Sequence, residues 1–221
     1  MIKELFVKSE NGYEKMIIRN YDYSDIPALQ SLQQTCFPPP FPEELLWSKE
    51  QLDSHVRHFN EGAMCAEING RLVGSMTSLI VAFDPSKPGH TWEEVTDNGF
   101  IRTHNENGNT LYIADISVDP EYRKLGIGKW LMQTMYELVV HRRLERLLGG
   151  GRIPLYHQVK DTMTPEEYVE SVLQGLRKDP VLSFLIQCGR VPIGVVRNYL
   201  DDEESVNYGV LMEWKNPFLY D

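Results

Sequence analysis

The spacing of hydrophobic residues divides the first third of the chain into helices and strands. Apolar residues at helical spacing predict helices over 24–36 and 43–59. A cluster of four prolines separates these helices, because proline cannot continue a helix. Two apolar runs on either side of Asn69-Gly70 predict a hairpin, since that dipeptide suits a tight two-residue turn.

The rest of the chain alternates between apolar runs and capped helices. The sequence Thr164-Pro165-Glu166-Glu167 is a capping box that begins a helix extending to about Lys178, and Asp179-Pro180 begins another that ends at Gly189. Residues 84–109 are polar and turn-rich, an excursion of the kind that often serves binding. The remaining predicted elements are a helix after Gly126 and strands at 16–20, 111–118, 146–153, 191–196 and 205–214. Strands that alternate with helices, together with the hairpins, predict a mixed α/β sheet.

Composition agrees with a single globular domain over residues 1–221. Hydrophobic residues make up 42% of the chain and charged residues 24%, an ordinary globular balance. Three cysteines far apart in the sequence fit a reduced cytosolic protein better than a secreted disulfide scaffold. No apolar stretch approaches the ~18 residues of a membrane span, and the first residues lack the apolar segment of a signal peptide. We therefore expect a cytoplasmic protein without a membrane partner.

The charge balance narrows the classes of partner. The chain has 22 lysines and arginines against 32 acidic residues, a net charge of −10. This disfavours nucleic-acid binding, which needs clustered cations. It favours a cationic small-molecule partner, although an acidic balance also serves solubility.

The segment from Ile116 to Lys129 carries the candidate chemistry. Arg123, Gly126 and Gly128 form the pattern R-x-x-G-x-G between a predicted strand and a predicted helix. A helix start offers unpaired N–H groups to phosphate, and glycines let the backbone approach the anion. The P-loop and dinucleotide-binding patterns both fail here, because the residues they need at 123, 130 and 131 are absent.

This segment resembles the acetyl-CoA-binding motif of the GCN5-related N-acetyltransferase (GNAT) superfamily. The order of elements is similar to that superfamily over a core of about 16–215. The resemblance implies a mostly antiparallel sheet flanked by helices, with a bulge in strand 111–118 that splays it from strand 147–153. It also implies that the backbone of Ile116 and Val118 pairs with pantetheine and that residues 124–129 hold the pyrophosphate. The implied cofactor-binding residues are Ile116, Ser117, Val118, Arg123, Lys124, Leu125, Gly126, Ile127, Gly128 and Lys129.

A closer resemblance comes from stretches outside this motif. GGGRIPLYH, TPEEYVESVLQG, DPVLSF and NYLDDEES…EWKNP resemble the acetyltransferase module that some bacteria fuse to a carbon–nitrogen hydrolase domain. The resemblance implies a free-standing version of that module. Residues 152–178 add a loop and a capped helix where superfamily members commonly have a short connection. We expect this insert to shape one wall of the acceptor site, the alternative being a helix that only extends the core or a dimer interface.

Four residues are candidates for the proton transfers of catalysis. Several superfamily members use a glutamate base whose place falls at Tyr112, a poor base by its ordinary pKa. Asp115 is the only acidic residue inside the strand and is the alternative base, unless it pairs with an arginine or a backbone N–H. Tyr156 and His157 follow the GGGRIP strand at the predicted mouth of the cleft, and His157 titrates in a suitable range. A surface-loop role is the other reading of His157.

Two further positions limit the chemistry. Many members protonate the leaving thiolate with a tyrosine whose place is held here by Leu185, so Tyr112, Tyr156 or water would supply the proton. His55 and His58 lie three apart on a helix without a third ligand, so no metal is expected.

The sequence therefore predicts acetyl transfer from acetyl-CoA to a primary amine by direct attack in a ternary complex. The acceptor is a small molecule or a peptide, with a cationic one favoured by charge. A CoA-binding sensor or scaffold with a degenerate site is the competing function, and a longer acyl donor is a second alternative. A homodimer is compatible with these predictions.

Overall fold

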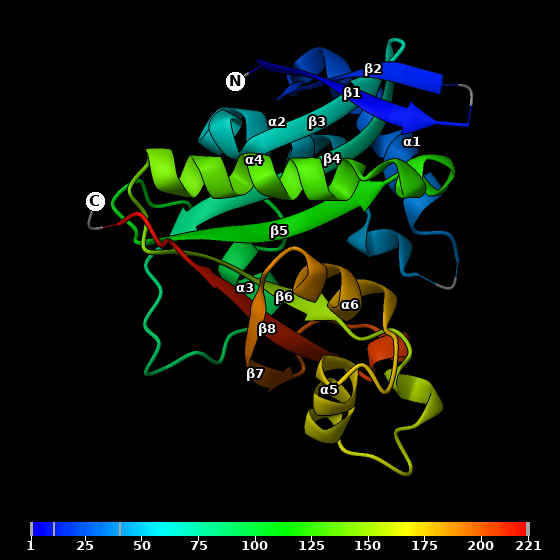
Figure 1. Cartoon of the computed structure of the whole chain (residues 1–221). Helices are drawn as coiled ribbons and strands as arrows, with labels where there is room; N and C mark the ends of the chain where they lie inside the picture. Colours follow the sequence, from blue (N-terminus) through cyan, green and yellow to red (C-terminus); the bar gives the residue numbers. More distant parts are fainter. Residues whose placement is uncertain (1, 11, 40, 220–221) are drawn as a thin grey trace.

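A computed structural model describes residues 2–10, 12–39 and 41–219. Eight strands form one sheet in the order β1-β2-β3-β4-β5-β6-β8-β7 (Figure 1). Neighbouring strands are antiparallel except β5 and β6, which are parallel. The strands are β1 (Ile2–Ser9), β2 (Gly12–Asn20), β3 (Ala63–Ile68), β4 (Arg71–Val81), β5 (Thr110–Val118), β6 (Arg146–Arg152), β7 (Val191–Arg197) and β8 (Tyr208–Lys215). The mixed, mostly antiparallel sheet confirms the predicted fold class.

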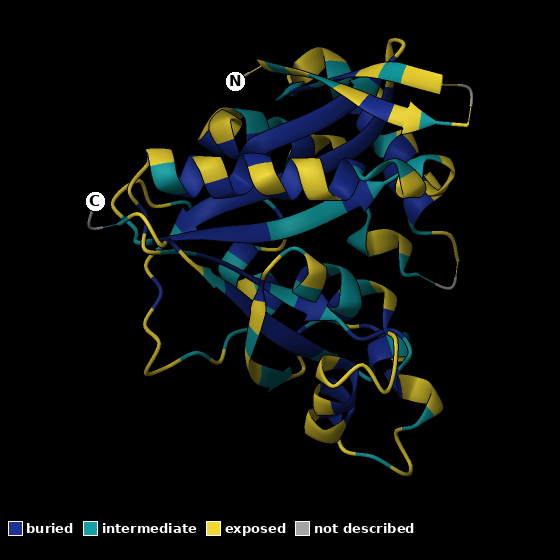
Figure 2. Cartoon of the chain, viewed as in Figure 1, coloured by how far each residue is buried: buried dark blue, intermediate teal, exposed yellow. Residues whose placement is uncertain are grey.

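Helices cover both faces of the central strands. In Figure 1, α4 crosses the front of the sheet, and α1 and α2 lie behind it. Residues 72–80 of β4 are all buried, as expected for a strand covered on both faces. Figure 2 shows the same pattern, with buried central strands and exposed residues on the outer side of α4. The helices are α1 (Ile26–Cys36), α2 (Lys49–Phe59), α3 (Trp92–Thr96), α4 (Ile127–His141), α5 (Pro165–Leu173) and α6 (Pro180–Gln187).

The sheet opens between β5 and β6. These strands pair over only three positions, from Thr110↔Arg146 to Tyr112↔Leu148. The register between β4 and β5 shifts at Ala114, which has no partner in β4 because Thr77 pairs with Asp115 and Ser78 with Ile113. A bulge of this kind bends its strand and increases its twist. The two strands therefore diverge beyond Tyr112 and leave the β6-facing edge of residues 113–118 without a partner strand.

Several predicted boundaries need correction. The second helix begins at Lys49 rather than 43, because Ser48 and Gln51 form a capping box there. The predicted strand at 16–20 extends back to Gly12 and pairs with β1, which the sequence reading did not predict. The predicted helix 165–178 ends at Leu173. The polar excursion 84–109 includes the short helix α3.

The insert at 152–178 packs beside α6. Its helix α5 contacts α6, and the Tyr168 hydroxyl donates to the Asp179 carboxylate at 2.9 Å. Asp179 in turn accepts from the N–H groups of Val181 and Leu182, which caps α6. Within the described residues no helix is long and apolar enough to cross a bilayer.

Candidate active site

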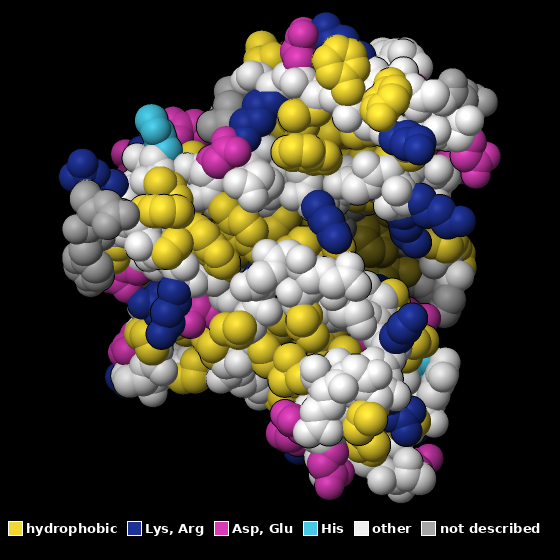
Figure 3. Space-filling view, in the orientation of Figure 1, with side chains coloured by type: hydrophobic (Ala, Val, Ile, Leu, Met, Phe, Trp, Pro, Cys, Tyr) yellow, Lys and Arg dark blue, Asp and Glu magenta, His cyan; other side chains and the backbone are white. Residues whose placement is uncertain are grey.

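A cavity of about 650 Å³ lies where β5 and β6 separate. Figure 3 shows a hollow lined by hydrophobic side chains between α4 and α6, flanked by lysine and arginine side chains. Its walls come from α1, from β5 and β6, and from α6. The lining includes Gln33, Cys36, Trp47, Trp92, Ile113, Asp115, Ile116, Val118, Arg123, Gly128, Gly149, Gly150, Arg152, Phe184, Leu185, Arg190 and Tyr199.

The helix α4 directs its N-terminus toward this cavity. Gly126 precedes the helix with φ +77°, a left-handed conformation that favours glycine, and has no side chain to cap the helix. The first N–H groups of α4 therefore remain available to an anion. Arg123, Lys124 and Lys129 are exposed at this end, and Arg123 Nε donates to the Val118 carbonyl at 3.2 Å.

Five of the ten predicted cofactor-binding residues line the cavity, and the other five do not. Ile116, Ser117, Val118, Arg123 and Gly128 are lining residues, whereas Lys124, Leu125, Gly126, Ile127 and Lys129 are not. Gly128 is buried, and a Cβ there would lie 3.0 Å from Cζ of Phe184. The absence of a side chain at 128 therefore lets α6 approach α4 closely.

The glycine run of β6 serves the same close packing. A Cβ on Gly149 would lie 2.9 Å from the Ile113 carbonyl oxygen, and one on Gly150 would lie 2.1 Å from Cζ of Tyr199. Any side chain at either position would displace β5 or Tyr199. The GGG segment is thus needed to keep this part of the cavity in shape.

Asp115 follows the bulge residue and lies on the cavity wall. Its Oδ2 accepts from Gln33 Nε2 and from Ser117 Oγ, both at 2.9 Å. Gln33 Nε2 also donates to Ser117 Oγ at 2.7 Å, which fixes the three groups together. Burial raises the pKa of Asp115 from 3.8 to about 6, although the hydrogen bonds from Ser117 and Gln33 oppose the rise. A carboxyl group with this pKa is largely ionised at neutral pH and can accept a proton.

Tyr112 is fully buried and does not line the cavity. Its hydroxyl lies 2.7 Å from that of Tyr199, a cavity-lining residue that sequence reasoning missed. Burial holds the pKa of Tyr112 well above its usual value and raises that of Tyr199 to about 12, so both phenols stay neutral. Tyr199 lies in the β7–β8 connection, within the stretch NYLDDEES, which contributes to the resemblance but predicts no catalytic role for this tyrosine.

Tyr156 and His157 lie away from the cavity lining. Tyr156 is buried, donates its hydroxyl to the Met163 carbonyl at 3.0 Å and packs against Tyr168. His157 is exposed, and its Nδ1 lies 2.8 Å from the Pro154 carbonyl oxygen. The structure therefore does not bring these two residues to Asp115, and the geometry gives their predicted catalytic role no support.

Two cavity residues restrict the possible chemistry. Leu185, in the place where superfamily members commonly carry a tyrosine, is buried and reaches the cavity from α6. Cys36 also lines the cavity, but burial raises the pKa of its thiol to about 12, so it stays protonated rather than nucleophilic. No group of three or more potential metal ligands occurs among residues 2–10, 12–39 and 41–219.

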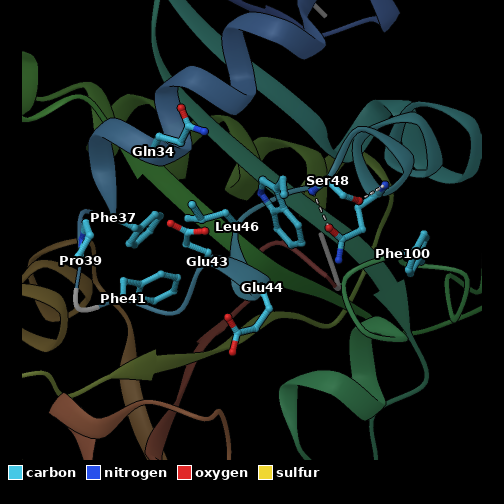
Figure 4. Close-up of a pocket in the computed structure, with 11 residues that line it drawn as sticks. Gln34, Phe37, Pro39, Phe41, Glu43, Glu44, Leu46, Ser48 and Phe100 are labelled. Atoms are coloured by element: carbon cyan, nitrogen blue, oxygen red, sulfur yellow. Dashed lines mark hydrogen bonds between the residues drawn. The ribbon is translucent and has the colours of Figure 1, made fainter.

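A second depression of about 600 Å³ adjoins the cavity on the side of the α1–α2 connection (Figure 4). Phe37, Phe41 and Trp47 line both spaces. The rings of Phe37 and Phe41 lie 4.8 Å apart between centroids. Glu43 and Glu44 add two carboxylates to its wall. This depression therefore combines aromatic surface with negative charge.

The insert contributes to the cavity only through its first residues. Arg152, Pro154 and Leu155 line it, whereas no residue of α5 does. The expected wall is thus short, and α5 supports α6 instead of forming it.

Comparisons with known proteins agree with this geometry. The family model described as "Acetyltransferase (GNAT) family" matches residues 26–159. The chain is 62% identical over 218 residues to the N-acetyltransferase YkwB of Bacillus subtilis (strain 168), covering 99% of this chain and 96% of that protein. It is 42% identical over 204 residues to the probable hydrolase YhcX of the same organism, covering 92% of this chain but only 39% of YhcX. A solved GphF GNAT-like decarboxylase in complex with isobutyryl-CoA shares the fold, with a TM-score of 0.72, 23% identity and coverage of 90% of this chain and 98% of that one.

Proposed function

The chain belongs to the acetyltransferase (GNAT) family and is an acetyl-CoA-dependent acyltransferase, and from that premise we propose that it acetylates a primary amine by direct attack in a ternary complex. The observation that carries this proposal is the position of Asp115. Its carboxylate lies on the wall of a cavity that is bounded on one side by the unpaired edge of β5 and by the N-terminus of α4. The proposed base, Asp115, is thus adjacent to the proposed acetyl-CoA site.

The cavity suits acetyl-CoA as co-substrate. The edge of β5 that has no partner strand at Ile116 and Val118 can pair with the amides of pantetheine as another strand would, and the Val118 carbonyl already accepts from Arg123. The N–H groups at the start of α4 and the exposed Arg123, Lys124 and Lys129 suit the pyrophosphate. The thioester would then lie near the bulge at Ala114.

Asp115 would act on the acceptor amine. The neutral amine nitrogen attacks the thioester carbonyl, a C–N bond forms, and the C–S bond breaks to release CoA thiolate. Asp115 accepts the proton that the nitrogen loses, directly or through a water. Water or the Tyr199 hydroxyl can protonate the thiolate, because Leu185 cannot.

Release of free thiol from acetyl-CoA in the presence of a panel of amines tests this function. We expect turnover with at least one amine, and loss of most of it in Asp115→Asn with CoA affinity retained. The competing function, a CoA-binding sensor or scaffold, predicts tight CoA binding with no amine-dependent thiol release. The second result would overturn the enzymatic proposal.

We propose that the acceptor approaches through the aromatic and acidic depression and carries positive charge. Glu43 and Glu44 line the depression, and Trp92, which precedes Glu93 and Glu94 in α3, packs against Trp47 on the depression wall with ring centroids 5.7 Å apart. Opposite charges attract at long range, and salt screens that attraction. The second-order rate constant for such an acceptor should fall as ionic strength rises, and a constant that ignores salt would contradict a cationic acceptor. The cytoplasmic location and the homodimer stay predictions.

A further inference from the structure

A buried arginine with no acidic partner lies at the deep end of the cavity. Arg190 immediately precedes β7, is 3% exposed and lines the cavity. A Cβ on Gly149 would lie 3.3 Å from its Nη2. Gly149 is the first residue of β6 beyond its pairing with β5. The guanidinium therefore sits where the two strands begin to separate.

The hydrogen bonds of Arg190 leave its charge uncompensated. Nη2 donates to the carbonyls of Gly149 and Met212, and Nε has no hydrogen-bond partner. In the described part of the chain, no carboxylate forms an ion pair with Arg190. Burial accordingly lowers the pKa of Arg190 from 12.5 to about 10, a value at which the group is still a cation at neutral pH.

Two other arginines that are largely buried, Arg146 and Arg152, form ion pairs of the kind that Arg190 lacks. Arg146 also has an Nε without a hydrogen-bond partner, but it pairs with Glu213 at 3.1 Å and with Glu145, so the difference from Arg190 lies in the ion pair. Arg152 pairs with Asp202 at 2.6 Å and with Glu204 at 2.9 Å. In a chain with ten more acidic than basic residues, a buried arginine without an acid is an exception. Burying an unpaired charge is costly, because it loses its hydration without gaining a counter-charge.

We propose that the cavity binds a substrate carboxylate at Arg190. The carboxylate would supply the missing negative charge to a guanidinium that lines the cavity, whereas the buried Nε lies out of its reach. The Tyr199 hydroxyl lines the same part of the cavity, but it accepts from Gly150 N at 3.2 Å and its proton is directed to Tyr112, so recognition of the carboxylate rests on the guanidinium. This proposal deepens the proposed acyl transfer and rests on it for the identity of the two substrates.

The carboxylate can come from either substrate. An acyl group that ends in a carboxylate would extend from the thioester, near the bulge at Ala114, to the guanidinium. An acceptor with a carboxylate beside its amine would place that group on Arg190 and its nitrogen near the thioester. The other interpretation of Arg190 is a purely structural link between β6 and β8, which predicts no preference for carboxylates.

Binding measured by calorimetry separates the two sources. In the donor arm, succinyl-CoA is compared with butyryl-CoA, and malonyl-CoA with propionyl-CoA, so that chain length is matched. In the acceptor arm, free amino acids are compared with their carboxamides in the presence of CoA, because amidation also changes the amine pKa and would confuse a rate. We expect the carboxylate form to bind at least tenfold tighter in one arm, in line with a charge-assisted hydrogen-bonded pair. Equal binding of charged and neutral forms in both arms would overturn the proposal.

Variants then assign the preference to Arg190. Arg190→Met should abolish the discrimination, and Arg190→Lys should retain part of it because it keeps the charge but not the fork of donors. Arg146→Met is the control, since it removes a largely buried arginine of β6 that does not line the cavity, and it should keep the preference. Discrimination that survives in Arg190→Met would overturn the proposal. If that variant does not fold, undiminished discrimination in Arg190→Lys together with a loss in Arg146→Met would do the same.

The test is independent of the proposed acetyl transfer. Failure of every amine to release thiol from acetyl-CoA would contradict the transfer, while calorimetry would still report the carboxylate preference. Conversely, turnover with amines and no carboxylate preference would leave the transfer standing and remove the role of Arg190.

Discussion

The hydroxyl oxygens of Tyr112 and Tyr199 lie 2.7 Å apart, and this contact is the centre of a chain of polar groups behind the cavity. Nε2 of His90 lies 2.9 Å from the Tyr112 hydroxyl, and its Nδ1 lies 2.8 Å from the Pro88 carbonyl oxygen. Since a carbonyl only accepts, Nδ1 carries the proton, and Nε2 accepts from Tyr112. Burial lowers the pKa of His90, in keeping with a neutral ring. The chain of hydrogen bonds thus runs from a cavity-lining hydroxyl to the loop before α3.

Replacing Tyr199 with phenylalanine should slow acyl transfer without abolishing it. A CoA thiol with a pKa of about 8.5, like that of cysteine, leaves tolerably as thiolate near neutral pH, so a dedicated acid is not required. We expect kcat from thiol release to fall severalfold, with CoA affinity retained. Tyr156→Phe is the control and should leave kcat unchanged, because its hydroxyl bonds to Met163 away from the cavity. Loss of all turnover in Tyr199→Phe with intact CoA binding would show that an essential acid exists.

Asp115 should give the pH profile of kcat/KM an acidic limb near pH 6. A base must be ionised, and burial raises the pKa of Asp115 to about 6, so activity should rise through that pH and fall about tenfold per unit below it. Ser117→Ala removes a donor that stabilises the carboxylate and should therefore move the limb to higher pH. Asp115→Asn should remove the limb and reduce kcat/KM by about 10²–10⁴. A profile that keeps its limb in Asp115→Asn would assign the base elsewhere.

Local sequence signals were sufficient for most elements of this fold. Prolines and capping residues marked the starts of α5 and α6, and Asn69-Gly70 marked the hairpin of β3 and β4. The pairing of β1 with β2 was missed because β1 has an exposed, mixed pattern. Yet the sequence contains Asn11-Gly12, the same dipeptide that identified the other hairpin, and β2 begins at Gly12.

The candidate site was only partly predictable, because some of its residues are assembled by tertiary contacts alone. Asp115 could be found as an acidic residue in an apolar strand. Arg190 comes from a segment with no motif and Tyr199 from a stretch to which the sequence assigns no role, and they reach the cavity because β7 and β8 return beside β6. His157 was predicted at the mouth from its distance along the chain, but the turn after β6 exposes it outside the lining. Sequence spacing cannot specify the direction of such a turn.

Gly128→Val should weaken CoA binding at least tenfold. The new Cβ would lie 3.0 Å from Cζ and 3.2 Å from Cε2 of Phe184, so the ring must move, and Phe184 lines the cavity. Extra methyl groups would also crowd the first N–H groups of α4. Gly194→Val is a matched control, because it lies on an exposed part of β7 where a Cβ meets nothing within 4 Å. Calorimetry that gives equal CoA affinity for the two variants would contradict this role of Gly128.

Asp179→Ala should lower both stability and acetyl-CoA affinity through α6. The fully buried carboxylate of Asp179 accepts from two N–H groups of α6 and from the Tyr168 hydroxyl. Loss of the cap costs about 1–2 kcal/mol, and the buried hydroxyl left without its partner adds about 1 kcal/mol. Urea unfolding should therefore show a decrease of about 2–3 kcal/mol. KM for acetyl-CoA should rise, because α6 carries Phe184 to the cavity.

Thr164→Ala is the control. It removes the cap of α5, which contributes no lining residue, so it should cost about 1 kcal/mol and leave KM unchanged. Equal changes of KM in the two variants would show that the effect is a general loss of stability and not a displacement of α6.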